Sequence, residues 1–490
     1  MATTFYIEQF GCRATQADAA AIERQLLDRG CTPTRESASA EFVVVNTCTV
    51  TAAADAQARD AIRKIHAANP NARIIATGCY AQRAPEDLAT LPGVAWVVGN
   101  SHKPHIPNLI ATHPSVETEP QVDFVLLTNL SSSPVGAQHC YAPSRQDRAT
   151  SRPTQILISD VFDQTEFLSA PVQGGESDHT RPTLKIQDGC NLRCAFCVIP
   201  FVRGKSRSLP PNDVVNEIRR LTVEQALLPV LPATTPRLSR AREIVLSGIN
   251  LGTYGRDLTP RADFLALLRR ILDETEIERL RLSSIEPQDV TQDLIGLFAK
   301  TNRLADHFHM PLQSGSDKIL AAMHRWYRAD HYARRVELIR ERLPHAAIGA
   351  DVIAGFPGET EADHAATLAF IERLPFTYLH VFSYSQRPGT KAAALPDQVP
   401  GDRIKRRARE LRALGEKKSV AFRQAQQGRT LSVLTLRGKL EPQQESAQEE
   451  KFTPAISSNY ARVQLSGAYA PNLFRDVRIT NVVDARLIGE

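Results

Sequence analysis

Three cysteines in the middle of the chain have the spacing of a metal site. Cys190, Cys194 and Cys197 form a C-x3-C-x2-C motif. Three thiolates at this spacing can each hold one iron of a [4Fe–4S] cubane, which leaves the fourth iron without a protein ligand. A small molecule can chelate such an open iron. The alternative is structural zinc, but zinc requires four closed ligands, and no fourth cysteine or histidine is close by in the sequence.

Three further cysteines, Cys12, Cys48 and Cys79, are far apart in the sequence, but each follows a predicted strand. Loops at the carboxyl ends of the strands in an open α/β sheet converge on one crevice. The three thiols can therefore meet and hold a second [4Fe–4S] cluster. The alternative is three buried structural thiols, since free cysteine is often buried. The remaining two, Cys31 and Cys140, match no motif, and we assign them no role.

The elements that must position these cysteines begin with an alternation of strands and helices. The predicted strands of this part are 4–9, 42–46, 73–77 and 95–98. Strands that alternate with helices predict an open, largely parallel α/β sheet, which we assign to residues 1–114. Residues 115–180 are rich in Ser, Arg, Pro and Gln and are expected to be a linker or insertion. Within them, 125–127 and 156–158 could still add strands to a neighbour.

A second alternation occupies residues 181–398. Its predicted strands are 183–186, 244–246, 279–282, 307–311, 348–353 and 378–382, with helical patterns between them. Six such repeats predict a partial (β/α)6 barrel. Residues 399–427 are strongly basic and predict a connecting helix. Short strand-like segments in residues 428–490 predict a small β-barrel.

The composition fits a protein of this organisation. At roughly 100–200 residues per domain, 490 residues allow about three domains. The net charge of +5 says little about partners, because local clustering of basic residues matters more. We see neither a secretory signal nor a stretch of the ~20 apolar residues that a membrane span needs. We therefore expect a cytoplasmic protein without a membrane partner, whose cysteines serve metal or catalysis rather than disulfides.

The two cysteine trios together resemble those of the radical S-adenosylmethionine methylthiotransferase family. The resemblance covers nearly the whole chain. It implies an N-terminal domain with an auxiliary [4Fe–4S] cluster, a radical S-adenosylmethionine barrel and a C-terminal TRAM β-barrel. Segments 46–51, 78–82, 282–287, 380–385 and 387–390 resemble the branch that acts on N6-threonylcarbamoyladenosine in transfer RNA. Residues 11–16 follow the pattern Gly-Cys-Lys-Thr-Asn-Gln of that family only loosely, although the cysteine is kept.

This resemblance implies a reaction at C2 of the adenine at position 37 in the anticodon loop of transfer RNA. The C2–H bond is not activated, so acid–base groups cannot break it easily and a radical is required. The cluster at Cys190, Cys194 and Cys197 would cleave S-adenosylmethionine, and the auxiliary cluster would supply the sulfur. The electron donor and the sulfur source stay unidentified. The alternatives are the branches that act on isopentenyladenosine or on a ribosomal-protein aspartate, and a non-catalytic iron–sulfur protein that binds RNA.

The resemblance also points to residues outside the cysteine trios. Contacts to S-adenosylmethionine are expected from Asn250, Gln313, Ser314, Gly315 and Asp351. The alternative for these residues is turn chemistry, because Gly and Ser serve tight loops. Contacts to RNA phosphates are expected from Arg403, Arg406, Arg407, Lys417 and Lys418. The alternative for these basic residues is a solvated charged face.

Overall fold

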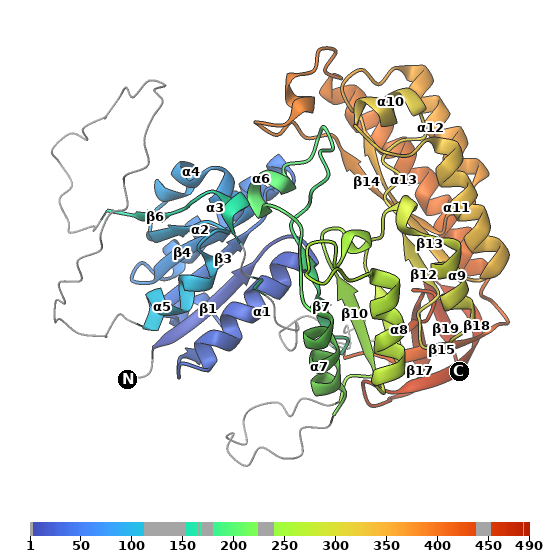
Figure 1. Ribbon diagram of the computed structural model, residues 1–490, viewed down its shortest axis with the longest axis horizontal. Helices are drawn as coiled ribbons and strands as arrows, with labels where there is room; N and C mark the ends of the chain where they lie inside the picture. The colour runs from blue at the N-terminus through green and yellow to red at the C-terminus, as the bar shows by residue number, and fades with distance from the viewer. Residues whose placement is uncertain are drawn as a thin grey trace, which may run out of the picture.

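The computed structural model describes residues 3–111, 153–164, 167–168, 180–223, 240–437, 452–483 and 485–490. Along these residues, an N-terminal sheet, a larger barrel and a small C-terminal barrel follow one another (Figure 1). No helix in this part of the chain has the length and apolar character that a membrane crossing requires. The predicted strand at 125–127 and Cys140 lie outside the described residues, as does most of the linker or insertion at 115–180.

The N-terminal sheet has six parallel strands in the order β2-β1-β3-β4-β5-β6. Their bounds are Thr4–Gln9 (β1), Thr32–Pro33 (β2), Phe42–Thr47 (β3), Arg73–Gly78 (β4), Val94–Val98 (β5) and Gln155–Leu157 (β6). Strand β3 is buried along its whole length, as expected of a central parallel strand covered on both faces. The predicted open α/β sheet is confirmed, and the segment at 156–158 contributes to its edge strand.

Helices cover both faces of this sheet (Figure 1). Helix α1 (Arg13–Leu27) packs Ile22 and Leu26 against one face, and α2 (Ala52–Ala68) packs Ile62 and Ile65 against the other. The shorter helices are α3 (Cys79–Arg83), α4 (Pro85–Ala89) and α5 (Ile106–Ala111). Helices α1, α2 and α3 each follow a strand, so the chain enters them from the edge of the sheet where the strands end.

The central unit has six parallel strands in chain order. They are β7 (Thr183–Lys185), β10 (Glu243–Ser247), β11 (Arg279–Leu282), β12 (His307–His309), β13 (Ala347–Ala354) and β14 (Tyr378–Ser383). They form two three-stranded sheets. Parallel bridges between Leu280 and Leu304, and between Ser284 and His309, join the two sheets. The predicted partial (β/α)6 barrel is therefore confirmed.

Seven helices and a short hairpin complete the described part of this unit. The helices are α7 (Pro211–Thr222), α8 (Phe264–Glu274), α9 (Gln292–Ala299), α10 (Asp317–Ala322), α11 (Ala329–Arg342), α12 (Glu361–Arg373) and α13 (Gly401–Gln424). The hairpin pairs β8 (Gln187–Asp188) with β9 (Arg207–Ser208) and carries α6 (Ile199–Arg203) in its loop. Helix α13, predicted as a connection, packs against β13, β14 and α12 and so belongs to the outer layer of the barrel.

The C-terminal barrel is closed, in the order β15-β16-β17-β19-β18. Its strands are β15 (Thr430–Thr435), β16 (Phe452–Ser457), β17 (Arg462–Ser466), β18 (Phe474–Val483) and β19 (Arg486–Gly489). It lies at the amino ends of the central strands (Figure 1). There, Arg279 donates to the carbonyl oxygen of Ile456 at 3.2 Å, and Arg281 donates to that of Ser458 at 2.9 Å.

A buried ion network joins the N-terminal domain to the central barrel. Asp18 on α1 accepts hydrogen bonds from Lys103 at 2.8 Å, from Arg203 at 3.0 Å and from Lys185 on β7. Asp188 accepts from Lys185 and Arg203, each at 2.9 Å. Burial alone would raise the pKa of Asp18, but Lys103, Lys185 and Arg203 outweigh burial and lower it.

A second contact lies beyond the other edge strand of the barrel, β14. Arg387 donates to Asp55 on α2 at 2.7 Å and to the carbonyl oxygen of Thr49 at 3.1 Å. Arg83 holds the same carboxylate at 2.9 Å. The N-terminal domain is therefore bonded to the barrel at both β7 and the segment after β14.

We expect the variant Asp18→Ala to be strongly destabilised. It leaves Lys185 and Arg203 with Asp188 as their shared carboxylate and removes the carboxylate that pairs with the buried Lys103. An uncompensated buried charge costs about 3–5 kcal/mol. Urea unfolding of the anaerobically purified protein measures the loss. The matched control is Asp60→Ala, whose ion pair with Arg63 is exposed and should contribute less than about 1 kcal/mol. Equal losses in the two variants would contradict a central role for Asp18.

Candidate active site

The first cysteine trio lies at the carboxyl edge of the N-terminal sheet. Cys12 follows β1, Cys48 follows β3, and Cys79 opens α3 after β4. These strands are neighbours in the sheet, so their ends meet at one edge. Cys48 lies close enough to both other thiols to interact with them electrostatically. Cys48 and Cys79 are buried, whereas Cys12 is exposed.

Two glycines allow the chain to approach these thiols. Gly11 has φ +98° and Gly78 has φ +100°, a region that other residues rarely adopt. A Cβ atom on Gly11 would lie 2.6 Å from Cβ of Cys48 and 2.9 Å from its sulfur. A Cβ atom on Gly78 would lie 2.3 Å from the carbonyl oxygen of Thr47. A larger side chain at either position would therefore displace the loops that hold the trio.

The second trio lies in the loop between β8 and β9, at the carboxyl end of β7. The backbone N–H of Leu192 donates to the sulfur of Cys190 at 3.4 Å. The guanidinium of Arg325 donates to the sulfur of Cys194 at 3.2 Å. Cys197 interacts electrostatically with both of the others, and burial raises its pKa to about 12. Without a bound cation, the Cys197 thiol therefore stays protonated at neutral pH.

Each trio fits a cluster that leaves one metal position open. Hydrogen-bond donors reach the sulfurs of both trios. In the first trio, the hydroxyl of Thr15 lies 3.7 Å from the sulfur of Cys12, and the amide nitrogen of Asn100 lies 3.6 Å from that of Cys79. In the second trio, the donors are the Leu192 backbone and Arg325. Such donors stabilise metal-bound sulfur. Within the described ranges, no fourth cysteine joins either trio, and Cys31 is buried in an apolar core instead. Three sulfurs suit a cubane with an open iron better than four-coordinate structural zinc.

The residues expected to contact S-adenosylmethionine differ in whether their polar atoms are already bonded within the protein. Asn250 is buried near Cys190, and neither polar atom of its amide has a partner within the described part of the chain. A buried, unpaired amide suits a polar ligand. Ser314 and Gly315 instead bond to the hydroxyl oxygen of Thr367 on α12, at 3.2 and 3.1 Å. That packing fits the turn alternative, and a ligand contact through Ser314 or Gly315 stays a prediction.

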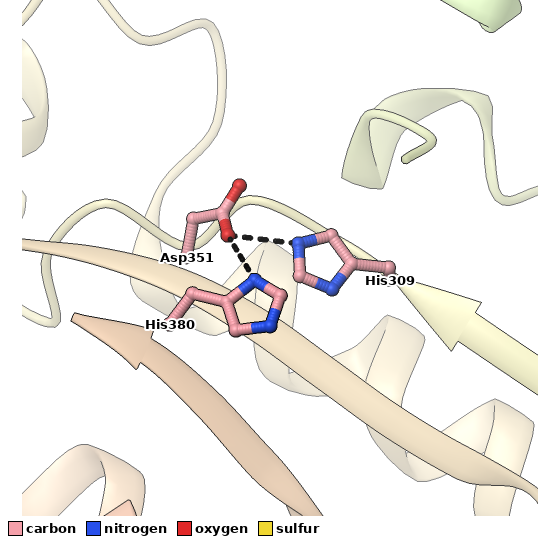
Figure 2. Close-up of side chains that lie close together, drawn as sticks. All are labelled: His309, Asp351 and His380. Atoms are coloured by element: carbon pink, nitrogen blue, oxygen red, sulfur yellow. Dashed lines mark hydrogen bonds and ion pairs between the residues drawn. The ribbon is translucent and has the colours of Figure 1, made fainter. Parts of the chain in front are cut away.

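Asp351, inside β13, lies in a cluster with His309 at the end of β12 and with His380, its register partner in β14. Figure 2 shows both imidazoles directed at one carboxylate oxygen. Nε2 of His309 lies 2.9 Å from this oxygen, and Nδ1 of His380 lies 3.3 Å from it. Burial alone would raise the pKa of Asp351, but the bonds to His309 and His380 hold it well below its usual range. Gln313 lies beside this cluster, because its backbone N–H donates to the carbonyl oxygen of Asp351 at 2.8 Å.

The hydroxyl of Tyr378 bonds His309 and so orients this cluster. This hydroxyl lies 2.9 Å from Nδ1 of His309 and 2.7 Å from Nε2 of His307. The ring crosses the barrel interior over Gly349, where a Cβ atom would lie 2.0 Å from the ring carbon Cζ. Glycine at this position is what makes room for the tyrosine, and the tyrosine in turn fixes the face of His309 that meets Asp351.

Two functional residues have no counterpart in the motifs that identified the site. Arg325 bonds Cys194 and forms a buried ion pair with Glu286. Glu286 belongs to segment 282–287, which resembles the family, but no motif pointed to Arg325 as the partner of Glu286. The next residue, Trp326, has 76% of its surface exposed. An exposed tryptophan next in sequence to the arginine that bonds Cys194 is available for stacking on a base.

The expectation that Arg407 contacts RNA is wrong. Its side chain is 1% exposed, and it bonds Glu359 at 2.8 Å and Glu361 at 2.7 Å. These ion pairs dock α13 on the barrel, so the guanidinium is not available to a phosphate. Arg406 also pairs with Glu361, while Lys417 bonds Glu372 and Lys418 caps two backbone carbonyls. Of the five residues, Arg403 is exposed and forms no ion pair with the described part of the chain.

The partial barrel and its three-cysteine loop define the class of protein. Residues 184–371 match the radical S-adenosylmethionine superfamily, and residues 4–99 match a family described as the uncharacterized protein family UPF0004. The fold is also similar to that of the radical S-adenosylmethionine methyltransferase TsrM from Kitasatospora setae. That structure has a TM-score of 0.52 and 16% identity, with 80% of this chain and 74% of that chain covered. The protein is thus a radical S-adenosylmethionine enzyme, which implies one [4Fe–4S] cluster and S-adenosylmethionine.

Curated relatives define the family more closely. A threonylcarbamoyladenosine tRNA methylthiotransferase MtaB from Aquifex aeolicus is 32% identical over 88% of this chain and 92% of its own length. The protein of the same name from Bacillus subtilis is 31% identical over 95% and 91%. A tRNA-2-methylthio-N(6)-dimethylallyladenosine synthase from Thermobifida fusca is 33% identical over 89% and 78%. The chain therefore belongs to the radical S-adenosylmethionine methylthiotransferase family, and its closed C-terminal barrel is consistent with a TRAM domain.

We expect the thiols of cluster-free protein to differ in reactivity. Cys12 is exposed, whereas burial raises the pKa of Cys48 to about 12 and that of Cys197 to about 12. Since the thiolate is the nucleophile, iodoacetamide at pH ~8 should label Cys12 well before Cys48 or Cys197. Mass spectrometry of the peptides gives the order. Equal labelling rates for Cys12 and Cys48 would contradict the described burial.

Proposed function

We propose that this protein is a transfer-RNA methylthiotransferase that acts on N6-threonylcarbamoyladenosine at position 37 of the anticodon loop. It would replace the C2 hydrogen of the base with a methylthio group. The observation that carries the proposal is the presence of two separate cysteine trios, each with three thiols in one place. Relatives from Aquifex aeolicus and Bacillus subtilis, both named for this nucleoside, support the choice of substrate.

We assign one [4Fe–4S] cluster to each trio. Cys190, Cys194 and Cys197 would hold the cluster that binds S-adenosylmethionine, and Cys12, Cys48 and Cys79 would hold the auxiliary cluster. When bound, the first cluster and S-adenosylmethionine supply a radical that can remove an unactivated hydrogen, and the second supplies sulfur. The buried ion network of Asp18 would keep the two trios in register, because it links α1, which follows Cys12, to α6, which follows Cys197.

The chain's own polar groups would position the small substrate. The unpaired amide of Asn250 lies near Cys190 and would bind the polar end of S-adenosylmethionine. The Asp351 carboxylate, fixed by His309 and His380, and the backbone at Gln313 would line the same pocket. Arg325 would hold the Cys194 sulfur in place through its hydrogen bond. These groups bind and orient, while the cofactors carry the chemistry.

We assign the anticodon loop to the face that carries the exposed groups. An adenine must leave the stack to reach an enclosed site, and unpaired loop bases are the ones that can be splayed out. Trp326 is exposed, follows the Arg325 that bonds Cys194, and would stack on a base. Arg403 on α13 would contact a phosphate. The C-terminal barrel, docked at the opposite end of the central strands, would hold another part of the RNA.

A second substrate is supported by the Thermobifida fusca relative, which is named for dimethylallyladenosine and is 33% identical. One experiment distinguishes the two. The protein is produced in a bacterial strain that lacks its own methylthiotransferases, and its transfer-RNA nucleosides are analysed by mass spectrometry. We expect the methylthio derivative of threonylcarbamoyladenosine with the wild-type protein and its absence with Cys190→Ala. Methylthiolation of the isopentenyl nucleoside instead would establish the second substrate.

We expect iron and sulfide analysis to separate the two clusters. Each cubane holds four irons, so anaerobically purified wild-type protein should contain about eight, and Cys190→Ala and Cys12→Ala about four each. The matched control is Cys31→Ala, a buried cysteine outside both trios, which should keep about eight. Zinc in place of iron, or an iron content that Cys12→Ala leaves unchanged, would contradict the assignment.

A further inference from the structure

An arginine beside the first trio has no carboxylate partner. Arg13 follows Cys12 directly and is the first residue of α1. It lies close enough to Tyr378 inside the barrel and to Tyr460 of the C-terminal barrel to interact with both electrostatically. Throughout the described ranges, no carboxylate forms an ion pair with Arg13. Its guanidinium therefore lies where three parts of the molecule meet, without a fixed counter-ion.

Neighbouring arginines add to the positive charge around Arg13. Arg181 and Arg281 are both within electrostatic range of Arg13. Both are bonded to Glu243, at 3.3 and 2.7 Å, and Arg279 shares the same carboxylate at 2.6 Å. Three guanidinium groups thus share one fully buried carboxylate, and Arg13 is not bonded to it. Asp306 is within electrostatic range of Arg279 and Arg281, and burial raises its pKa, which weakens it as a counter-ion.

Aromatic and neutral polar groups line the space beside Arg13. The ring of Tyr460 stacks on His307, with 4.4 Å between centroids, and Arg281 lies 5.3 Å from the Tyr460 centroid. Tyr378 bonds His307 at 2.7 Å. Burial and the nearby Arg281 lower the pKa of His307 well below its usual value, so this imidazole is neutral. The lining therefore offers hydroxyl and imidazole groups to a ligand of Arg13. The two carboxylates within electrostatic range of this lining, Asp351 and Glu243, are already bonded to two histidines and to three arginines.

We propose that Arg13, with Tyr378 and Tyr460 beside it, binds the carboxylate of the threonylcarbamoyl group on the substrate base. A buried cation needs an anionic partner, and a planar guanidinium matches a carboxylate through two parallel hydrogen bonds. Arg13 is adjacent to Cys12, where the sulfur would be supplied to C2. The N6 substituent lies on the same six-membered ring as C2, so its carboxylate falls within reach of the residue next to the trio. This inference rests on the proposed function.

An RNA phosphate is the other source of an oxyanion, and the experiment distinguishes the two. It uses two anticodon stem-loops that differ at position 37. One carries threonylcarbamoyladenosine, and the other carries the same group with a neutral carboxamide in place of the carboxylate. Both are given to reconstituted full-length enzyme, and kcat/KM for methylthiolation is measured. The variants are Arg13→Gln and Arg13→Lys, with Arg24→Gln, on the exposed end of the same helix, as the matched control.

We expect wild-type enzyme and Arg24→Gln to prefer the carboxylate RNA by roughly 10- to 150-fold, the range for a hydrogen bond to a charged group. Arg13→Gln should abolish this preference by losing rate on the carboxylate RNA alone, and Arg13→Lys should keep part of it. An equal loss on both RNAs would assign Arg13 to a phosphate and overturn the inference. An unchanged preference in Arg13→Gln would also overturn it.

Iron content and the activity of the wild-type enzyme keep the test decisive. Iron content reports whether Arg13→Gln still holds both clusters. Should this variant lose iron, the wild-type preference and the Arg13→Lys result decide the matter, and a wild-type enzyme without a preference overturns the inference. If wild-type enzyme modifies neither RNA, the proposed function itself fails, which is a different outcome from loss of discrimination.

Discussion

The buried carboxylate of Asp18 sets the relative position of the two halves of the site. It lies on α1, two turns after Cys12, and it bonds Lys185 on the first barrel strand and Arg203 at the end of α6. These groups are almost without solvent contact, so breaking one leaves the others as unpaired buried charges. In the proposed reaction, one trio supports radical formation and the other supplies sulfur to the same carbon of the base. The two trios must then keep a fixed separation, and this network supplies the rigidity.

Much of the fold could be predicted because its signals are local. All six central strands lie within a few residues of their predicted bounds. In β10 at Glu243–Ser247, for example, a short apolar run between helical patterns marks the strand. The meeting of Cys12, Cys48 and Cys79 followed from their places after neighbouring parallel strands. Long-range ion pairs could not be predicted. Arg407 belongs to a basic run that suggests an exposed face, and only folding brings Glu359 and Glu361 to it.

The same difference between local and long-range signals explains which site residues could not be predicted. Arg325 and Cys194 are 131 residues apart, and their contact depends on how the loop after α10 returns to the barrel rim. Tyr378 reaches His309 only because Gly349 lacks a side chain, which is a packing condition rather than a motif. Sequence spacing therefore identifies the sulfur atoms that we propose as metal ligands. The residues that tune those atoms are set by three-dimensional packing.

The attachment of the N-terminal domain at two places has a consequence for how a nucleotide reaches the interior. No described strand pairs β7 with β14, so the central barrel lacks a wall between these edges. Asp18 anchors one side of that opening through Lys185, and Asp55 anchors the other through Arg387. The first domain serves as the missing wall. While both anchors hold, a base flipped out of RNA must arrive along the barrel axis, because lateral entry would require one anchor to break.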